Sequence, residues 1–319
     1  MNINLKMKIT IISYDNWGFN IHISNVLTQR GHFVNHIDLY SFRYKYPSFY
    51  LRIKNFIFKL FLKKNLKHIY YGEKIIELLK NQERQDLILT IKGDFIDNKS
   101  IIEFKNHAKK SIAFFNDAIS RYPNIKNVLP LFDEVYSFEK KDCEKYNLKF
   151  KTNFIYQQNT ENKEKHKYQL FNISSRDKRT KIILKVASAL KKLDINYKIF
   201  IFDNKKKLKK SDIIEIIEKP IPMEKVNQFI DDSEVLLDIH RSKQDGLSFR
   251  VFESLGKEKK IITTNKDIKN YDFYNEQNIL IIDENFEIPK SFFDSKYIPI
   301  PEMILKKYLI ENWVETFLN

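Results

Sequence analysis

Apolar runs and amphipathic stretches alternate along the chain. Residues 7–14 (MKITIISY) form a β-rich apolar run, residues 19–30 have helical periodicity that ends at Gly31, and residues 33–38 form a second apolar run. A strand, a helix and a second strand in this order are the building block of a parallel sheet. The opening of the chain therefore predicts an α/β domain.

The same alternation fills both halves of the chain. In the first half it predicts helices over 49–68, 72–81, 98–108 and 138–146, and strands over 86–91, 111–116, 134–137 and 153–156. In the second half it predicts strands over 168–174, 197–202, 235–239, 260–264 and 279–282, helices over 177–193, 222–231 and 247–255, and two short helical stretches over 301–309 and 311–318. Residues 157–167 (QQNTENKEKHK) are polar, lack periodicity and are interpreted as a linker.

Two such halves predict two Rossmann-like domains with parallel sheets facing a central cleft. We assign residues 1–160 to an amino-terminal domain and residues 165–300 to a carboxy-terminal domain, and we expect residues 301–319 to pack back on the first. Ligands of doubly wound sheets bind at the carboxyl ends of the strands, so the functional residues are sought directly after the predicted strands.

The segment with the clearest chemistry is VLLDIHRSKQDGLSFRVFESLGKEKKIITTN, residues 235–265. A buried strand leads through a polar loop to Gly246 and then to a helix that carries Arg250 and Glu253. A helix start preceded by glycine suits a diphosphate, Arg250 adds a charged donor fork, and Glu253 can accept hydrogen bonds from ribose hydroxyls at the edge of a wet cleft. An amphipathic helix with Arg250 paired to an acid fits the same spacing equally well.

This segment resembles the donor-binding segment of GT-B glycosyltransferases, in which two acids are separated by seven intervening residues. Asp245 and Glu253 match that pattern, with Asp245 in place of the usual Glu. FNISSRDKRTKIILKVASAL, residues 171–190, resembles the turn whose small and basic residues reach the donor phosphates, although Arg176 and Arg179 also fit solvated surface charges. The resemblance implies that the donor is bound by Arg176, Arg179, Asp245, Gly246, Leu247, Ser248, Arg250 and Glu253.

The second half as a whole is similar to transferases of bacterial lipopolysaccharide and capsule clusters. The resemblance implies a hexosyltransferase-like enzyme that moves a sugar from a nucleotide-sugar, bound by the carboxy-terminal domain, to a lipid-linked or oligosaccharide acceptor on the amino-terminal one. It implies neither a cofactor nor a metal ion. An inverting enzyme needs a base for the acceptor proton, and Asp15, Asp117 and His22 are the candidates. A helix cap is the alternative role for Asp15.

Two other classes of protein fit the sequence less well. A dinucleotide-dependent oxidoreductase or epimerase needs a glycine-rich fingerprint after the first strand, and SYDNWGFN contains one glycine. A nucleic-acid-binding protein is suggested only by the formal charge of +15, and no known binding motif accompanies that charge. We therefore expect a nucleotide-sugar partner and no nucleic-acid partner.

Much of the positive charge is concentrated in one predicted helix. Six basic residues and no acidic ones lie within 51–70, namely Arg52, Lys54, Lys59, Lys63, Lys64 and Lys67, while Ile53, Phe56, Ile57, Leu60 and Phe61 line one helical face. Such a helix is typical of an anionic membrane surface, and a core helix with a solvated basic face is the alternative.

The expected location follows from what the chain lacks. No apolar run approaches the roughly 20 residues that span a bilayer, and the first apolar run is too short for a signal peptide. Cys143 is the single cysteine, so no intrachain disulfide forms and no catalytic thiol is expected. We expect a cytoplasmic protein with a peripheral position on the inner face of the cell membrane.

Overall fold

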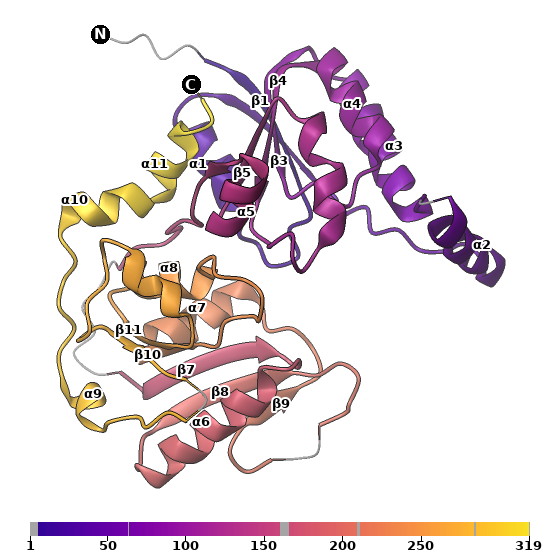
Figure 1. Ribbon diagram of the computed structural model, residues 1–319. Helices are drawn as coiled ribbons and strands as arrows, with labels where there is room; N and C mark the ends of the chain where they lie inside the picture. Colours follow the sequence, from indigo (N-terminus) through magenta and orange to yellow (C-terminus); the bar gives the residue numbers. More distant parts are fainter. Residues whose placement is uncertain (1–5, 63, 160–165, 209–210, 284, 319) are drawn as a thin grey trace. The chain divides into compact units, whose positions relative to one another are not determined.

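The chain forms two compact units in a computed structural model that describes residues 6–62, 64–159, 166–208, 211–283 and 285–318. One unit comprises residues 1–152 together with 310–319, and the other comprises residues 153–309. Within the described residues, each unit is built on one six-stranded sheet whose neighbouring strands are all parallel (Figure 1).

The sheet of the first unit has the strand order β2-β1-β3-β4-β5-β6. Its strands are β1 (Lys8–Ser13), β2 (Phe33–Asp38), β3 (Gln85–Ile91), β4 (Ala108–Phe115), β5 (Glu134–Ser137) and β6 (Lys149–Phe150). Its helices are α1 (Ile21–Gln29), α2 (Phe49–Phe61), α3 (Leu66–Lys80), α4 (Asn98–His107), α5 (Lys140–Tyr146) and α11 (Ile310–Glu315). The strand order reverses between β1 and β3, which is the switch point of a flavodoxin-like sheet.

Helices cover both faces of this first sheet, which explains why its strands are nearly continuous apolar runs. Figure 1 shows α3 and α4 side by side on one face, with α1 and α11 on the other. Tyr71, Ile75 and Phe104 from α3 and α4 are buried against Ile12 and Ile88 of the sheet.

The last helix, α11, joins the first unit although it follows the whole second unit in the sequence. Trp313 is buried, its Nε1 donates to the carbonyl oxygen of Thr152 at 2.8 Å, and its ring packs edge-on against Phe114. Arg30 at the end of α1 forms an ion pair with Glu315. The described part of residues 301–309 belongs to the second unit instead.

The sheet of the second unit has the strand order β12-β11-β10-β7-β8-β9. Its strands are β7 (Tyr168–Ser175), β8 (Tyr197–Phe202), β9 (Glu215–Ile217), β10 (Ser233–Asp238), β11 (Lys260–Thr263) and β12 (Ile279–Ile281). Its helices are α6 (Thr180–Lys192), α7 (Met223–Asp231), α8 (Phe249–Gly256), α9 (Ser291–Asp294) and α10 (Glu302–Leu305). With the strands counted along the chain, this order is the 3-2-1-4-5-6 arrangement of dinucleotide-binding sheets, with its switch point between β7 and β10.

Residues 153–156 do not form the strand that the sequence predicts. They belong to the second unit, where Ile155 makes an isolated parallel bridge to Leu309 and Tyr156 reaches α8. Gly256 permits this path, because a Cβ there would collide with the carbonyl oxygen of Gln157. The two units thus divide at residue 152, before the polar segment 157–167, of which residues 160–165 lie outside the described part.

The predicted helix over 49–68 is two helices. Ser48 caps α2 by accepting a hydrogen bond from the amide of Leu51, and Asn65 caps α3 by accepting one from the amide of Lys67. Two capping residues within one periodic stretch start two separate helices. The short elements β9 and α9 were not predicted, because a three-residue strand and a four-residue helix carry too little periodicity.

None of the helices in the described ranges combines the length and the apolar character needed to cross a membrane.

Candidate functional site

The carboxyl ends of β7 and β10 are the switch point of the second sheet. The two strands pair in parallel, and the chain turns toward β8 after β7 but toward β11 after β10. In open α/β sheets the loops that diverge at such a point leave the crevice in which ligands bind. The donor-binding residues predicted from the sequence lie on the loops that follow these two strands and on α8.

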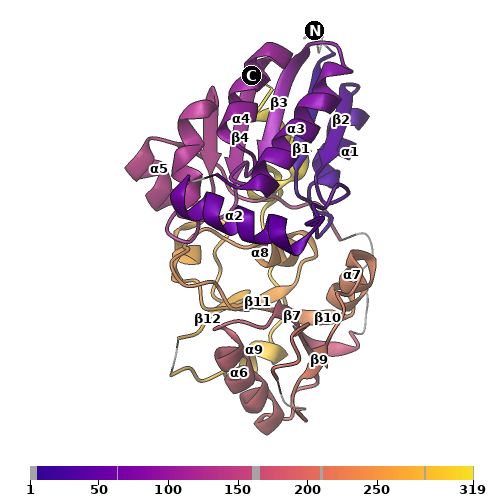
Figure 2. The same ribbon diagram turned by 90° about the vertical axis from the view of Figure 1, so that its right-hand side faces the viewer.

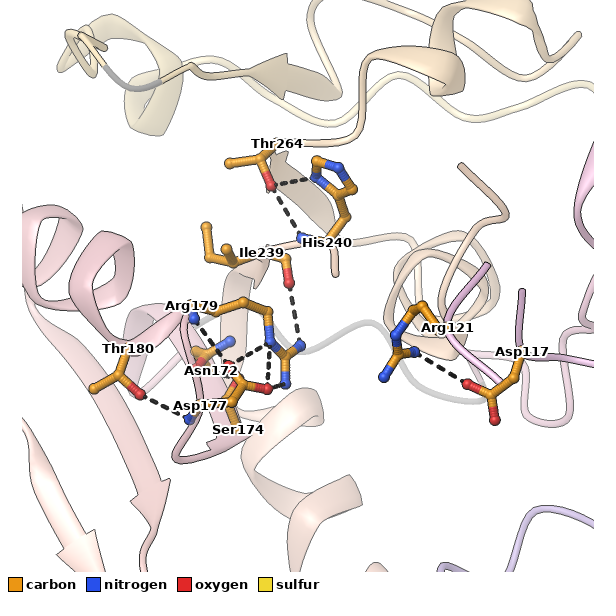
Figure 3. Close-up of polar contacts among 10 residues, drawn as sticks. All are labelled: Asp117, Arg121, Asn172, Ser174, Asp177, Arg179, Thr180, Ile239, His240 and Thr264. Atoms are coloured by element: carbon orange, nitrogen blue, oxygen red, sulfur yellow. Dashed lines mark hydrogen bonds and ion pairs between the residues drawn. The ribbon is translucent and has the colours of Figure 1, made fainter. Parts of the chain in front are cut away.

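Arg179 links the two loops (Figure 3). Its Nη1 donates to the carbonyl oxygen of Ile239 at 3.2 Å, and its Nε and Nη2 donate to the Asp177 carboxylate at 3.0 and 2.8 Å. Burial favours a raised pKa for Asp177, but the hydrogen bonds from Arg179 outweigh it and hold that pKa below its usual value. Arg179 is therefore a positioned cation at the switch point and not a solvated surface charge.

Arg176 turns away from the switch point toward the loop after β8. Its Nε donates to Asp203 Oδ1 at 2.9 Å, and Asp203 also accepts hydrogen bonds from the amides of Lys207 and Leu208. The side chain of Asp203 is almost completely buried. Arg176 thus orders a neighbouring loop, whereas Arg179 stands between β7 and β10.

Buried polar side chains hold the two central strands in register beneath these loops. Asn172 Nδ2 donates to the carbonyl oxygen of Leu237 at 2.7 Å, and Ser174 Oγ donates to Asn172 Oδ1 at 3.1 Å. Ser248 Oγ donates to Asp238 Oδ1 at 2.8 Å. Sequence reasoning missed Asn172 and Asp238, although a polar residue inside a buried apolar strand is the signal that points to such a network.

The end of β11 fixes the loop that follows β10. The His240 amide and Nδ1 both contact Thr264 Oγ1, at 3.0 and 2.8 Å (Figure 3), and Asn265 Nδ2 donates to the carbonyl oxygen of Asp245 at 2.9 Å. Asp245 is half-buried, whereas Gly246 and Leu247 are buried. Residues that follow β11 therefore hold this loop at His240 and at Asp245.

The start of α8 lies at the same edge of the sheet as Arg179. Ser248 occupies the N-cap position, but its side chain bonds Asp238 and does not cap its own helix. The amino end of a helix carries a partial positive charge and favours an anion nearby. The arrangement therefore combines a helix dipole with a fixed arginine at one switch point.

Arg250 and Glu253 form a buried pair on α8. Arg250 Nη1 lies 2.7 Å from Glu253 Oε2, with 13 and 5 % of the two side chains exposed, but Nη1 makes no hydrogen bond, so the contact is an ion pair. Glu253 Oε1 accepts a hydrogen bond from the Tyr156 hydroxyl at 2.6 Å, and burial followed by the Glu253 charge raises the pKa of Tyr156. The expectation that Glu253 lines a wet cleft therefore does not match the structure. The sequence analysis missed Tyr156 because it lies outside the segment 235–265.

Comparison with known proteins bears on the fold of the whole chain. Neither a protein-family model nor a curated protein sequence matches it. The crystal structure of WaaG, a glycosyltransferase involved in lipopolysaccharide biosynthesis, is similar over 97 % of this chain and 94 % of its own, with a TM-score of 0.51 and 13 % identity. The catalytic domain of starch synthase IV from Arabidopsis thaliana, bound to ADP and acarbose, covers 98 % of this chain and 95 % of its own, with a TM-score of 0.50 and 8 % identity.

The chain has the GT-B fold. Both neighbours match over nearly the full length of both chains, and each unit has the parallel six-stranded sheet that a Rossmann-like GT-B domain requires. At 8 to 13 % identity the likeness is one of fold, so the chemistry has to be argued from the residues of this chain.

In the amino-terminal GT-B unit, Asp15 follows β1 directly and holds the start of α1. Its Oδ2 accepts hydrogen bonds from the amides of Asn20 and Ile21 at 2.8 and 3.0 Å, and its own amide donates to Asp38 Oδ1. Burial raises the pKa of Asp15, and the nearby Asp38 charge adds to this rise. Asp15 has the helix-capping contacts that the sequence allowed, together with the raised proton affinity that suits a base. Burial also lowers the pKa of His22, another of the three candidates.

Asp117 follows β4 and lies between two cations. Its Oδ2 is 2.5 Å from Lys92 Nζ, and its Oδ1 accepts a hydrogen bond from Arg121 Nη1 at 3.1 Å (Figure 3). Burial alone would lower the pKa of Lys92. The nearby Asp117 carboxylate has the opposite effect and is part of why the pKa is raised overall. Asp117 therefore balances the charges of Lys92 and Arg121 in this structure.

Asp94 is a third carboxylate that follows a strand of the first sheet, as Asp15 and Asp117 do. The sequence analysis did not select it as a site residue. Its Oδ1 is buried and accepts no hydrogen bond from the described residues, and burial raises its pKa. It also lines a groove of about 1550 Å³ that runs past Lys59, His68 and Lys99. The signal was available in the sequence, because Asp94 follows β3 after Lys92 and Gly93, but its significance depends on knowing which strands are neighbours.

Within the described ranges, no group of three or more His, Cys, Asp or Glu side chains is arranged to hold a metal ion. Cys143 is buried, and burial raises the pKa of its thiol to about 11. Since the thiolate is the nucleophilic form, this cysteine is not suited to catalysis at neutral pH.

Proposed function

We propose that the protein is a glycosyltransferase that moves a sugar from a nucleotide-sugar donor to a growing bacterial surface glycan, either lipopolysaccharide or capsule. The observation that carries the proposal is Arg179, held at the switch point of a sheet with the dinucleotide-binding strand order, at the same sheet edge as the start of α8. The structural neighbour WaaG is involved in lipopolysaccharide biosynthesis, which supports a lipopolysaccharide acceptor. The structural neighbour starch synthase IV is bound to ADP, which supports a donor that contains a nucleotide.

The donor would bind through its diphosphate. Arg179 and the amides of residues 246–248 would neutralise the phosphates, with Arg250 as a further cation. Arg176 would assist only after its side chain leaves Asp203 and turns toward the switch point. Asp245 would contact the sugar. Glu253 would accept hydrogen bonds from the ribose hydroxyls, which requires a ribose hydroxyl to replace the Tyr156 hydroxyl as the donor to its carboxylate.

The chemistry in its inverting form needs one base and one stabilised leaving group. The acceptor hydroxyl oxygen forms a bond to the anomeric carbon, the bond from that carbon to the diphosphate oxygen breaks, and the electron pair leaves with the nucleoside diphosphate. The acceptor proton passes to a carboxylate, for which we propose Asp15 first and Asp117 second. Protein cations and the dipole of α8 stabilise the leaving charge, so the proposal is a hexosyltransferase-like reaction that involves neither a cofactor nor a metal ion.

The acceptor would bind to the amino-terminal unit. Its groove carries both basic and acidic side chains, including the unsatisfied Asp94 carboxylate, and such a lining suits the hydroxyls of a sugar chain. We propose a lipid-linked or oligosaccharide acceptor and a cytoplasmic enzyme.

A panel of nucleotides tests the proposal without knowledge of the acceptor. Thermal unfolding is recorded with UDP, GDP, CMP, dTDP and their sugar conjugates, and slow hydrolysis of each conjugate to nucleotide and free sugar is followed by chromatography. We expect one nucleotide family to raise the midpoint of unfolding, because a ligand that binds only the folded state stabilises it. We also expect the matching sugar conjugate to be hydrolysed.

The matched control for this panel is a pair of single substitutions on or beside α6. Arg179→Ala should lose the stabilisation, whereas Lys192→Ala, an equal charge change at the exposed far end of α6, should retain it. If no nucleotide shifts the midpoint, or if both variants respond like the wild type, the proposed donor site is wrong.

A further inference from the structure

Helix α2 exposes most of its large apolar side chains, and its one fully buried side chain is polar. Within the helix the fully buried side chain is Asn55, while large apolar side chains are exposed, namely Phe49, Tyr50, Ile53, Phe56, Ile57, Leu60 and Phe61. Phe49 and Phe61 are each 74 % exposed and Phe56 is 66 % exposed. A helix that served as part of the core would place these side chains inward, so the core alternative does not describe α2.

Specific polar contacts hold α2 in this orientation. Asn55 Nδ2 donates to the Tyr46 hydroxyl at 2.5 Å and lies 3.3 Å from Asn65 Oδ1, and Asn55 Oδ1 accepts a hydrogen bond from the amide of Leu66 at 2.8 Å. The amide of one buried residue thus ties α2 to the segments before and after it. Figures 1 and 2 show that α2 lies beyond the sheet of its unit and at an angle to α3.

Basic side chains flank the apolar face of α2 on both sides. At 100° per residue, Phe49, Ile53, Phe56, Ile57 and Leu60 fall within one sector of about 100°. On the same projection, Arg52 and Lys59 border that sector on one side, and Lys54 follows it on the other.

Acidic residues are absent from this part of the sequence, with none between Asp38 and Glu73. The exposed surface of α2 itself therefore combines apolar side chains with positive charge only, while acidic side chains of other elements, such as Glu73 and Asp97, line the groove that Lys59 also lines. Two basic residues named from the sequence do not contribute to this argument, because Lys63 lies outside the described residues and Lys67 packs over the rings of Tyr14 and Tyr71.

We propose that α2 is an interfacial helix that binds an anionic lipid bilayer. Its apolar side chains enter the boundary between headgroups and acyl chains, and Arg52, Lys54 and Lys59 contact lipid phosphates from either side. Charge complementarity selects this partner, because positive borders without any acidic residue match a phosphate-rich plane. The proposal does not depend on the reaction that the enzyme catalyses.

Vesicle flotation with the full-length protein tests this proposal. Vesicles of phosphatidylcholine alone are compared with vesicles that also contain phosphatidylglycerol, at low and high salt. We expect flotation with the anionic vesicles, and we expect it to weaken as salt is added. Absence of flotation with anionic vesicles at low salt would overturn the proposal.

Two pairs of substitutions separate the apolar and the charged contributions. Phe56→Ser with Leu60→Ser should abolish flotation, and Arg52→Glu with Lys54→Glu should weaken it roughly thirtyfold or more, from the contribution of each charge near an anionic surface. The matched control is Ile102→Ser with Lys105→Glu on the exposed face of α4, which should float like the wild type. Equal loss in the control pair would contradict a specific role for α2.

If the apolar face of α2 binds a protein and not a membrane, the experiments give different results. If α2 binds a second copy of the chain, light scattering shows a concentration-dependent dimer that Phe56→Ser with Leu60→Ser abolishes, without flotation of the wild type. That result would replace the proposal. Donor hydrolysis is measured on the same variants, and it should be unchanged in all of them, so a failure of lipid binding is distinguished from a failure of the proposed activity.

Discussion

Charged residues at the carboxyl edge of the second sheet occur in pairs. Arg179 is paired with Asp177, Arg176 with Asp203, and Arg250 with Glu253. Pairing orients each guanidinium before any ligand arrives, and such preorganisation reduces the ordering cost of binding. The sequence analysis located these arginines after β7 and β10, because the apolar runs 168–174 and 235–239 indicate where those two strands end.

The partners of these arginines could not be found from spacing alone. Asp203 follows a different strand, and Tyr156 precedes the second sheet entirely. Which of the two interpretations of Glu253 applies also depended on burial, which the sequence does not contain. The same limit explains why Asp94 was missed, since its unsatisfied oxygen is a property of packing.

Glu253→Ala should destabilise the protein. The substitution leaves the Arg250 guanidinium buried without its counter-charge and removes the shorter of the Tyr156 hydroxyl's hydrogen bonds to oxygen, so the free energy of unfolding should fall by about 3 kcal/mol. Urea titration measures this change, and Glu258→Ala, beyond the end of α8, is the control. A loss under about 0.5 kcal/mol for Glu253→Ala would show that the pair contributes little.

Asp15→Asn should lower turnover by about 10²–10⁴-fold with little change in donor affinity. The asparagine oxygen can still accept the two amides at the start of α1, so the helix cap is retained. Because the pKa of Asp15 is raised and the base acts in its ionised form, wild-type turnover should fall as the pH drops through a value above the ordinary 3.8.

The matched comparison for Asp15→Asn is Asp117→Asn. If the Asp15 variant turns over at a near-normal rate and keeps the acidic limb of the profile, the base is another group, with Asp117 next in order.

At the level of elements, strands were easier to predict than helix orientation. The central strands are buried on both faces, so apolar runs marked them without ambiguity. Helix α2 has the periodicity of a core helix, but periodicity does not say which face is buried. The single polar residue on its narrow inner face, Asn55, is what distinguishes the two orientations.

Asn55→Ala should loosen α2 without unfolding the unit. The substitution removes the hydrogen-bond partner of the Leu66 amide and of the Tyr46 hydroxyl. The loss of a buried hydrogen-bond partner lowers the free energy of unfolding by about 1–3 kcal/mol. Hydrogen exchange followed by mass spectrometry should show faster exchange over residues 46–66 only. Asn106→Ala on the exposed face of α4 is the control, and equal protection in the Asn55 variant would contradict the anchoring role.

At the level of the whole molecule, the chain forms two α/β units and ends in the first. The sequence predicted the two-domain fold from two series of alternating elements, and the GT-B similarity covers both. The division at residue 152 was less accessible, because it depends on the contacts of residues 153–157 with α8.

Trp313→Ala should destabilise the first unit strongly. The indole is buried against Phe114 and Phe317, and loss of a buried aromatic side chain costs about 3–5 kcal/mol. Trp17, which is 46 % exposed, provides the control Trp17→Ala. Thermal unfolding of both variants should show a large loss for Trp313 only, and equal midpoints would mean that α11 adds no stability.

The central claim is that the second unit binds a nucleotide diphosphate at the β7–β10 switch point. Isothermal titration calorimetry tests it most directly, with the nucleotide selected by the thermal panel titrated into wild type, Arg179→Ala, Arg250→Ala and Lys192→Ala. Loss of one charge-assisted hydrogen bond costs roughly 1.5–3 kcal/mol, so the two arginine variants should bind about ten- to a hundredfold more weakly while Lys192→Ala binds normally. Unchanged affinity in both arginine variants would contradict the claim.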